Sequence, residues 1–383
     1  MADSKHLPAL DGLRGVAILM VIAGHVSSGL FGALSLYQNT NGMAHSFAMP
    51  QWLDVIASCG YHGVTLFFVV SAFTLMRQAL HGGLQDVWGY TLRRVFRIGP
   101  GFWVAAIAYA VLLGLGPRQS APAGFTAIDL FMGATFAGWL GSHSALNIVP
   151  GGWSVQTEIV FYTLLPVLTW LMAGRFWRAA LITVAAVVAA QGLARMSMVQ
   201  GTWNYDSYVV PLVQLPVFMF GVSAAFCFSY RLPERFRRWV PGAALLALGL
   251  AIAVVPFSPV RDWWLLGHVQ FAALAALATL LSAWAPPRLL TAPILVRVGT
   301  VSYSMYLIHF VLLWPMFMVA QWAWPANDAV TMTLDFLLVC AGSYGMSCLS
   351  YAVVEQPPRR WIASRLRARG VTSKTAVNHP AVV

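Results

Sequence analysis

The stretch from Leu10 to Val26 reads LDGLRGVAILMVIAGHV and combines a long apolar run with ionisable side chains. Arg14 stands near its beginning and His25 lies deep inside it. At 100° per residue, their spacing puts both on one helix face, roughly 16 Å apart along the axis. An ionisable group inside a membrane span costs several kcal/mol unless it is paired or solvated, so it marks a site or a pathway. The stretch therefore predicts a membrane helix with a functional face.

The composition indicates an integral membrane protein. Apolar residues make up 59% of the 383-residue chain and charged residues 9%, and the mean hydropathy is +0.71. A soluble protein has about 25% charged residues. The formal charge of +11 does not indicate nucleic-acid binding, because Lys and Arg collect in short segments between apolar runs, as topology signals do. The expected class is an all-α polytopic membrane protein in contact with membrane lipids.

Ten apolar stretches are long enough to cross a bilayer core of roughly 30 Å. The predicted spans are 15–34, 60–79, 99–116, 153–173, 179–196, 209–229, 240–256, 264–284, 299–321 and 330–353. They form a single domain over 1–370, followed by a short tail at 371–383 that we expect to be disordered and cytoplasmic.

The basic segments predict the orientation of these spans. The positive-inside rule assigns the segments at 93–97, 175–178, 231–239, 286–297 and 357–370 to the cytoplasm. The stretch 35–58 has no Lys or Arg and should face outward. A full crossing by 125–140 would invert every later basic segment. We therefore expect 125–140 to be re-entrant and both termini to be cytoplasmic.

Further polar residues lie in other predicted spans. They are candidates for an enzyme site or a proton path, and comprise Ser71, Trp153, Glu158, Tyr162, Tyr306 and His309. Neutral His25 can accept a proton from a hydroxyl, and a carboxylate can orient the resulting imidazolium. The alternative for a single histidine is a structural hydrogen bond to a neighbouring helix. Metal chemistry is not expected, because the sequence has no HExxH motif and no Cys/His cluster.

Six motifs in order resemble the integral-membrane acyltransferase 3 family. They are LDGLRGVAILMVIAGHV at 10–26, GVTLFFVVSAF at 63–73, RRVFRIGPGFW at 93–103, GGWSVQTEIVFY at 151–162, SYSMYLIH at 302–309 and YAVVEQPPRRW at 351–361. The first has the family's Arg-x10-His spacing through Arg14 and His25. The third has its Arg-x-x-Arg element through Arg94 and Arg97. The second departs from the family at Ala72, where Gly is usual.

The resemblance implies a bacterial enzyme of the cytoplasmic membrane that acylates surface carbohydrates or related acceptors. It implies that the acyl donor is cytoplasmic acyl-CoA, commonly acetyl-CoA, and that the acceptor is a carbohydrate or glycolipid. No permanently bound cofactor is expected. His25 and Arg14 are implied to be essential. Arginine forks suit the phosphates of CoA, so we expect Arg14, Arg94 and Arg97 to bind the donor. Positive-inside anchoring would explain Arg94 and Arg97 equally well.

The expected mechanism is direct O-acyl transfer with His25 as general base. Glu158 or a nearby tyrosine is expected to stabilise the imidazolium or to bind the acceptor. Asp11 is expected to support the site together with the polar residues named above. A covalent acyl-enzyme relay remains open. The alternative function is a proton-coupled transporter of a small molecule or acyl group, which would also place His and Glu inside spans.

Overall fold

The described part of the computed structural model comprises residues 6–27, 47–84, 86–117, 121, 123–140, 148–201, 208–230, 232–257 and 266–368. These residues form helices and no strand. The predicted tail at 371–383 and the first half of the predicted outer stretch at 35–58 lie outside them. The prediction of an all-helical protein is confirmed.

Ten helical stretches among these residues are long and apolar enough to cross a membrane, as predicted. They are Pro8–Ser27, Gln51–Gly82, Val87–Leu113, Gly152–Met172, Phe176–Val199, Pro211–Phe228, Val240–Phe257, Gly267–Trp284, Ser302–Ala323 and Ala329–Ala368.

Individual helices subdivide some of these stretches. The long helices are α1 (Pro8–Ser27), α3 (His62–Gln78), α4 (Val87–Leu113), α6 (Gly152–Met172), α7 (Phe176–Val199), α9 (Pro211–Phe228), α11 (Val240–Ala253), α12 (Leu266–Trp284), α14 (Ser302–Ala323), α15 (Ala329–Ser350) and α16 (Gln356–Ala368). The shorter helices are α2 (Gln51–Ser58), α5 (Ala127–Ala134), α10 (Glu234–Arg237) and α13 (Pro293–Thr300). The described residues also form short helical turns: η1 (Cys59–Tyr61), η2 (Ala79–Gly83), η3 (Gly138–Leu140), η5 (Val255–Phe257), η6 (Leu289–Thr291) and η7 (Tyr351–Glu355).

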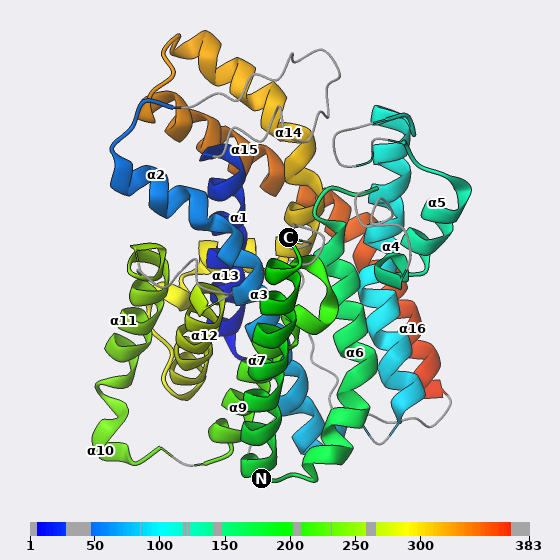
Figure 1. Cartoon of the computed structure of the whole chain (residues 1–383), viewed down its shortest axis with the longest axis vertical. Coiled ribbons are helices and arrows are strands. Elements are labelled where there is room, and N and C mark those ends of the chain that lie inside the picture. The colour runs from blue at the N-terminus through cyan, green and yellow to red at the C-terminus, as the bar shows by residue number, and fades with distance from the viewer. Residues whose placement is uncertain are drawn as a thin grey trace.

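Helix α1 lies in the middle of the bundle (Figure 1). It packs against α3, α13, α14 and α15. On one side of α1, α3 packs against α9 and α12. Helix α7 packs against α9, and α11 packs against α12. On the other side of α1, α4 contacts α6, α14 and α16. Because helices surround α1, an ionisable side chain on it faces other helices rather than lipid.

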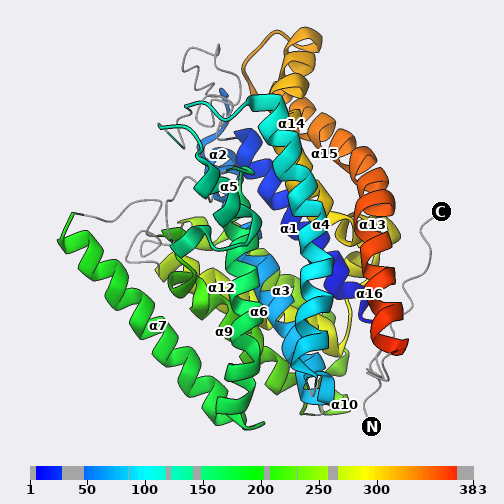
Figure 2. The same ribbon diagram turned by 90° about the vertical axis from the view of Figure 1, so that its right-hand side faces the viewer.

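The segment 125–140 contains α5, which has eight residues. A helix of this length spans about 12 Å and cannot cross the bilayer core. Its first turn is a capping box, in which Thr126 accepts from the Asp129 amide and Asp129 accepts from the Thr126 amide. Its last turn accepts a hydrogen bond from Nε1 of Trp103 on α4. Figure 2 shows α5 beside the upper part of α4, on the half of the bundle that also holds α2.

Two predicted helix boundaries were too late in the sequence. The first span begins at Pro8 rather than residue 15, because Asp11 and Arg14 neutralise each other inside the first turns of α1. The segment 93–97, predicted to precede a span at 99, lies inside α4, which begins at Val87 after the N-cap Asp86. Helix α4 continues through Pro100.

Helix α1 approaches the start of α3 through two glycines. A Cβ on Gly60 would lie 2.1 Å from the carbonyl oxygen of Met20 and 2.5 Å from the amide nitrogen of Gly24. Both contacts are with backbone atoms, which cannot rotate away. The crossing therefore requires glycine, and it positions the C-terminal half of α1, which carries His25.

We expect Gly60→Ala to destabilise the folded protein, because the added methyl group forces the two backbones apart. Overpacking of this kind costs about 1–3 kcal/mol. Gly249→Ala in α11 is the matched control, since nothing lies within 4 Å of the added Cβ there, and alanine favours a helix by about 0.5–1 kcal/mol. Thermal unfolding in lipid nanodiscs should show a lower midpoint for Gly60→Ala alone. Equal midpoints for the two variants would contradict the close crossing.

Candidate active site

A cavity of about 70 Å³ lies where α1, α3, α4, α6 and α14 meet. Its polar lining comprises Arg14, Ser71, Arg97, Ser154, Glu158, Tyr162, Ser302, Tyr303 and Tyr306. Phe67, Phe68 and Val64 of α3 form part of its apolar wall. Five segments that are distant in the sequence thus converge on one polar space within an apolar bundle.

Glu158 is the acidic centre of this cavity. Its Oε1 atom accepts hydrogen bonds from the Ser71 hydroxyl and, at 2.5 Å, from the Tyr162 hydroxyl. Tyr162 lies one helical turn after Glu158 on α6, so both side chains leave the helix on the same face. Two hydroxyl donors on one oxygen fix the position of the Glu158 side chain.

Two arginines border the same cavity. Arg14 donates from Nη1 to Oδ1 of Asp11 at 2.8 Å and from Nη2 to the Thr74 hydroxyl at 3.4 Å. Arg97 on α4 is subject to the charges of Glu158, Asp11 and Glu355. The guanidinium groups give this part of the cavity the character of an anion site, partly balanced by carboxylates.

Arg94 is adjacent to the cavity but is not part of its lining. Its Nη2 atom donates to Oε1 of Gln78 at 3.1 Å. Its guanidinium lies over the rings of Tyr90 and Tyr162, at 5.6 and 5.9 Å from their centroids. The buried Nε atom of Arg94 has no hydrogen-bond partner in the described residues.

His25 pairs with His309 of α14. Nδ1 of His309 lies 3.1 Å from the Met305 carbonyl oxygen, which can only accept, so this nitrogen carries the proton. With both rings neutral, Nε2 of His309 is then the acceptor for Nδ1 of His25, 2.9 Å away. The lone pair of His25 is consequently on Nε2. This tautomer follows from the hydrogen-bond network.

Tyr306 borders both the cavity and the histidine pair. Its hydroxyl donates to the Gly151 carbonyl at 2.9 Å and accepts from the Ser154 hydroxyl at 2.9 Å. Its ring centroid lies 5.8 Å from that of His309. Gly151 has φ of +73°, a left-handed conformation that glycine adopts without strain, at the N-cap of α6. The start of α6 is therefore fixed against α14 at this tyrosine.

The structure brings most of the predicted site residues together. Arg14, Ser71, Arg97, Glu158, Tyr162 and Tyr306 share the cavity. His25 and His309 form the neighbouring pair. Trp153 packs edge-on against Phe68 and Tyr208 and so supports the wall of α3. The hydrogen bonds of Glu158 go to Ser71 and Tyr162, so its predicted role toward His25 remains a prediction.

Two buried polar networks were not predicted from the sequence. Ser304 donates to Oε1 of Glu355, which is 4% exposed and lies near Arg97. Gln214 accepts from Nε2 of His268 at 2.9 Å. The side-chain amide of Gln214, inside the apolar sequence of α9, could have indicated the second network. Ser304 gave no such signal, because serine is common in membrane helices.

Comparison with known proteins agrees with the motif pattern. A family model described as an acyltransferase domain matches residues 7–352, nearly the whole chain. The chain is also similar to acyltransferase MdmB of Streptomyces mycarofaciens, with 25% identity over 387 residues covering 94% of this chain and 93% of that protein. No solved structure matches.

His6, just before α1, should make the thermal stability of the folded protein depend on pH. The hydrogen bond from Nε2 of His6 to Asp11, at 2.6 Å, raises the pKa of His6 above its ordinary value of 6.5, against the opposing effects of burial and Arg14. A raised folded-state pKa gives stabilisation that is complete below the unfolded pKa and is lost as pH rises through the folded pKa. The wild type should therefore exceed His6→Gln in thermal midpoint at about pH 5.5, and this advantage should shrink toward about pH 8.5. An advantage that is constant or grows with pH would contradict the pairing.

Proposed function

The chain belongs to the integral-membrane acyltransferase 3 family, and from this membership we propose that it transfers an acyl group from acyl-CoA to a hydroxyl of a carbohydrate or glycolipid acceptor. The proposed donor is acetyl-CoA. The observation that carries the catalytic part of the proposal is the pairing of His25 with His309.

His25 is the proposed general base, and His309 is its positioning residue. His309 accepts from Nδ1 of His25, so the lone pair that takes the proton of the acceptor hydroxyl is on Nε2 of His25. Once His25 is protonated, its Nδ1–H still donates to neutral His309, and this hydrogen bond then stabilises the positive charge. The Met305 carbonyl holds His309 in the required tautomer.

The proposed reaction is balanced without a further reactant. Nε2 of His25 removes the hydroxyl proton as the acceptor oxygen attacks the thioester carbonyl carbon. The C–O bond forms, the C–S bond breaks, and the thiolate of CoA takes the proton from the His25 imidazolium. The products are the O-acyl ester and free CoA, and His25 returns to its neutral form.

The arginine side of the cavity is the proposed donor site. CoA carries a pyrophosphate and a 3′-phosphate, which arginine forks can bind in bidentate fashion. Arg14 and Arg97 line the cavity, and Arg94 lies beside it with an unpaired Nε atom. Glu158, held by Ser71 and Tyr162, is the proposed acceptor-binding group, because its second oxygen can accept a substrate hydroxyl.

A donor from the cytoplasm and an acceptor from the outer side require a defined orientation of the chain in the proposed bacterial cytoplasmic membrane. Ten crossings return the chain to the side on which it starts. We propose that this side is the cytoplasm, because Arg235, Arg237 and Arg365 would then follow the positive-inside rule. The segment 125–140 is the proposed re-entrant element on the outer half. Single cysteines at Ala127 and Leu140 should then react with an impermeant reagent from outside, and a reaction of Leu140→Cys only from the cytoplasm would refute this topology.

We expect His25→Gln to abolish acyl transfer while CoA binding survives. General-base assistance is worth about a hundred- to ten-thousand-fold in rate, and Arg14 lies roughly 16 Å from His25 along α1. His309→Phe should lower kcat by a smaller factor without raising the KM for the donor, because it removes only the acceptor that orients His25. Arg97→Ala should weaken CoA binding by about 1.5–3 kcal/mol through a lost charge-assisted contact.

The test measures CoA binding and acyl transfer separately on purified, monodisperse protein. Arg175→Ala is the matched control for Arg97→Ala, since Arg175 is exposed at the start of α7. Near-normal turnover of His25→Gln would make this histidine structural and direct the search for the base to Glu158 or His309. Unchanged CoA affinity of Arg97→Ala would leave Arg97 without a role in donor binding.

A further inference from the structure

Helices α4 and α16 pack side by side, and their contacts show which residues lie opposite each other (Figure 1 and Figure 2). A Cβ on Gly101 of α4 would lie 3.7 Å from Cγ of Glu355, the last residue before α16. Further along α16, Trp361 contacts Phe96 of α4, with ring centroids 5.5 Å apart. The residue numbers of the two contacts rise along α16 and fall along α4, so the two helices are antiparallel.

This register brings two arginines opposite each other. Arg97 lies four residues before Gly101, and Arg359 lies four residues after Glu355, so each is one turn along the same face of its helix. The charge of Arg97 acts on Arg359, as expected for neighbouring guanidinium groups. Both side chains are half-buried, and Arg97 also lines the polar cavity. Two positive charges are therefore held together beside the cavity.

The carboxylates near these arginines have other partners. Glu355, whose charge acts on both arginines, accepts a hydrogen bond from α14. Asp11 and Glu158 also act on Arg97, but each is hydrogen-bonded to other side chains. In the part of the chain that the structure describes, neither Arg97 nor Arg359 forms a direct ion pair with a carboxylate. The repulsion between the two guanidinium groups is thus offset only by more distant charges.

The next residue, Arg360, shows a different arrangement. It is exposed, and its Nη2 atom donates to Oε1 of Gln356, one turn earlier on α16, at 2.6 Å. Arg359 instead lies over the ring of Tyr351, with its guanidinium carbon 5.9 Å from the ring centroid. Tyr351 is buried, so this contact keeps Arg359 on the inner face of α16. Two consecutive arginines therefore differ in their surroundings, and only the first faces α4.

The chemistry of this pair suits a phosphate group. A guanidinium group donates two parallel hydrogen bonds to a phosphate, and the tetrahedral arrangement of phosphate oxygens allows two such groups to bind at once. An anion between two guanidinium groups replaces their repulsion by attraction, most strongly where water is scarce.

The pair also lies where phosphate groups are present. The continuous helical stretch Ala329–Ala368 has 40 residues, or about 60 Å of helix, and the bilayer core is about 30 Å thick. Helix α16 therefore extends beyond the core, and in the proposed orientation it does so on the cytoplasmic side. Phosphate groups reach that level on acyl-CoA and on lipid headgroups.

We propose that Arg97 and Arg359 together bind one phosphate group between α4 and α16, and that this group belongs to the acyl-CoA donor. The inference rests on the proposed function and adds Arg359 to its donor site. A donor is favoured over a lipid because Arg97 also lines the polar cavity. The rest of a CoA molecule is polar apart from a short acyl group, whereas a phospholipid carries two long apolar chains that a polar lining disfavours.

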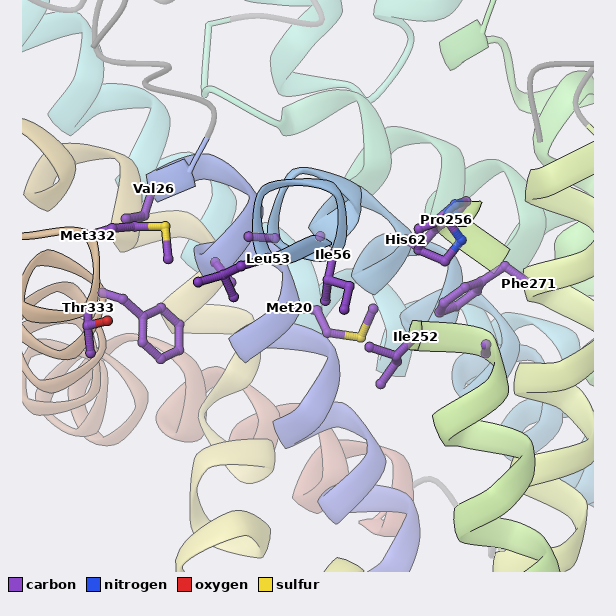
Figure 3. Close-up of a pocket in the computed structure, with 15 residues that line it drawn as sticks. Met20, Val26, Leu53, Ile56, His62, Ile252, Pro256, Phe271, Met332 and Thr333 are labelled. Atoms are coloured by element: carbon purple, nitrogen blue, oxygen red, sulfur yellow. The ribbon is translucent and has the colours of Figure 1, made fainter. Parts of the chain in front are cut away.

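A second, larger pocket on another side of α1 offers no comparable site. It has a volume of about 230 Å³ and is bounded by α1, α2, α11, α12 and α15. Figure 3 shows that its wall is formed largely by apolar side chains such as Met20, Leu53 and Phe271. No Asp, Glu, Lys or Arg lines it. A phosphate there would lose its hydration without a compensating charge.

The test measures CoA binding to purified protein in phosphatidylcholine nanodiscs. Arg359→Gln should weaken CoA binding about 10- to 100-fold through the loss of a charge-assisted contact. The matched control, Arg360→Gln, should bind CoA like the wild type. Arg359→Lys should bind with intermediate affinity, because lysine keeps the charge but not the fork. If Arg359→Gln does not fold, Arg359→Lys carries the test, and wild-type affinity of that variant would then overturn the proposal.

A double variant tests whether the two arginines share one phosphate. Arg97→Gln and Arg359→Gln combined should weaken CoA binding by less than the product of the two single effects, because each single variant already disturbs the same contact. Effects that multiply fully would show two independent sites and would overturn the shared one.

Two further outcomes separate this inference from the proposed function. A wild-type protein that binds no CoA would reject the proposed donor, and the inference with it. Wild-type CoA affinity of Arg359→Gln, with CoA binding intact in the wild type, would reject the inference alone. The lipid source is tested by adding phosphatidylglycerol to the nanodiscs. If this lipid raises the thermal midpoint of the wild type but not of Arg359→Gln, and both bind CoA equally, the pair binds a lipid headgroup and the proposal is wrong.

Discussion

Polar side chains inside a bilayer must find their partners within the protein, and this constraint shapes the bundle around α1. The helix carries Asp11, Arg14 and His25. Asp11 is satisfied by Arg14 and His6 at the helix entrance, while His25 is satisfied by His309 of α14. A lipid-facing position would offer none of these groups. The enclosure of α1 by other helices is therefore a requirement of its sequence, and the glycine crossing at Gly24 and Gly60 allows it.

The sequence predicted the spans well because their signal is local. A run of apolar residues long enough to cross a bilayer needs no tertiary information. The common face of Arg14 and His25 also follows from helix geometry alone. The early start of α4 did not follow, because 93–97 reads as a basic loop by charge. The segment is helical although it is basic. Gln78 accepts a hydrogen bond from Arg94, and the rings of Tyr90 and Tyr162 lie against its guanidinium. The contacts with Gln78 and Tyr162 are tertiary.

The contacts between residues of the site could not be predicted from the sequence either, because they are also tertiary. His25 and His309 are separated by 284 residues, and Ser71 and Glu158 by 87. Both His309 and Ser71 were predicted as site residues from their type and depth, but nothing local pairs them with a particular partner. The tautomer of His25 depends on one further atom, the Met305 carbonyl oxygen, which no side-chain pattern encodes. The sequence thus predicts which residues are unusual, and the fold determines what each of them contacts.

The polar side chains of the cavity have partners that the fold supplies. Hydroxyl groups of Ser71 and Tyr162 hold Glu158, and the charges of Glu158, Asp11 and Glu355 act on Arg97. Preorganised polar groups suit a step in which charge develops, because they need no rearrangement when it appears. On this argument, the proposed chemistry is assigned to the side of α1 that faces α14.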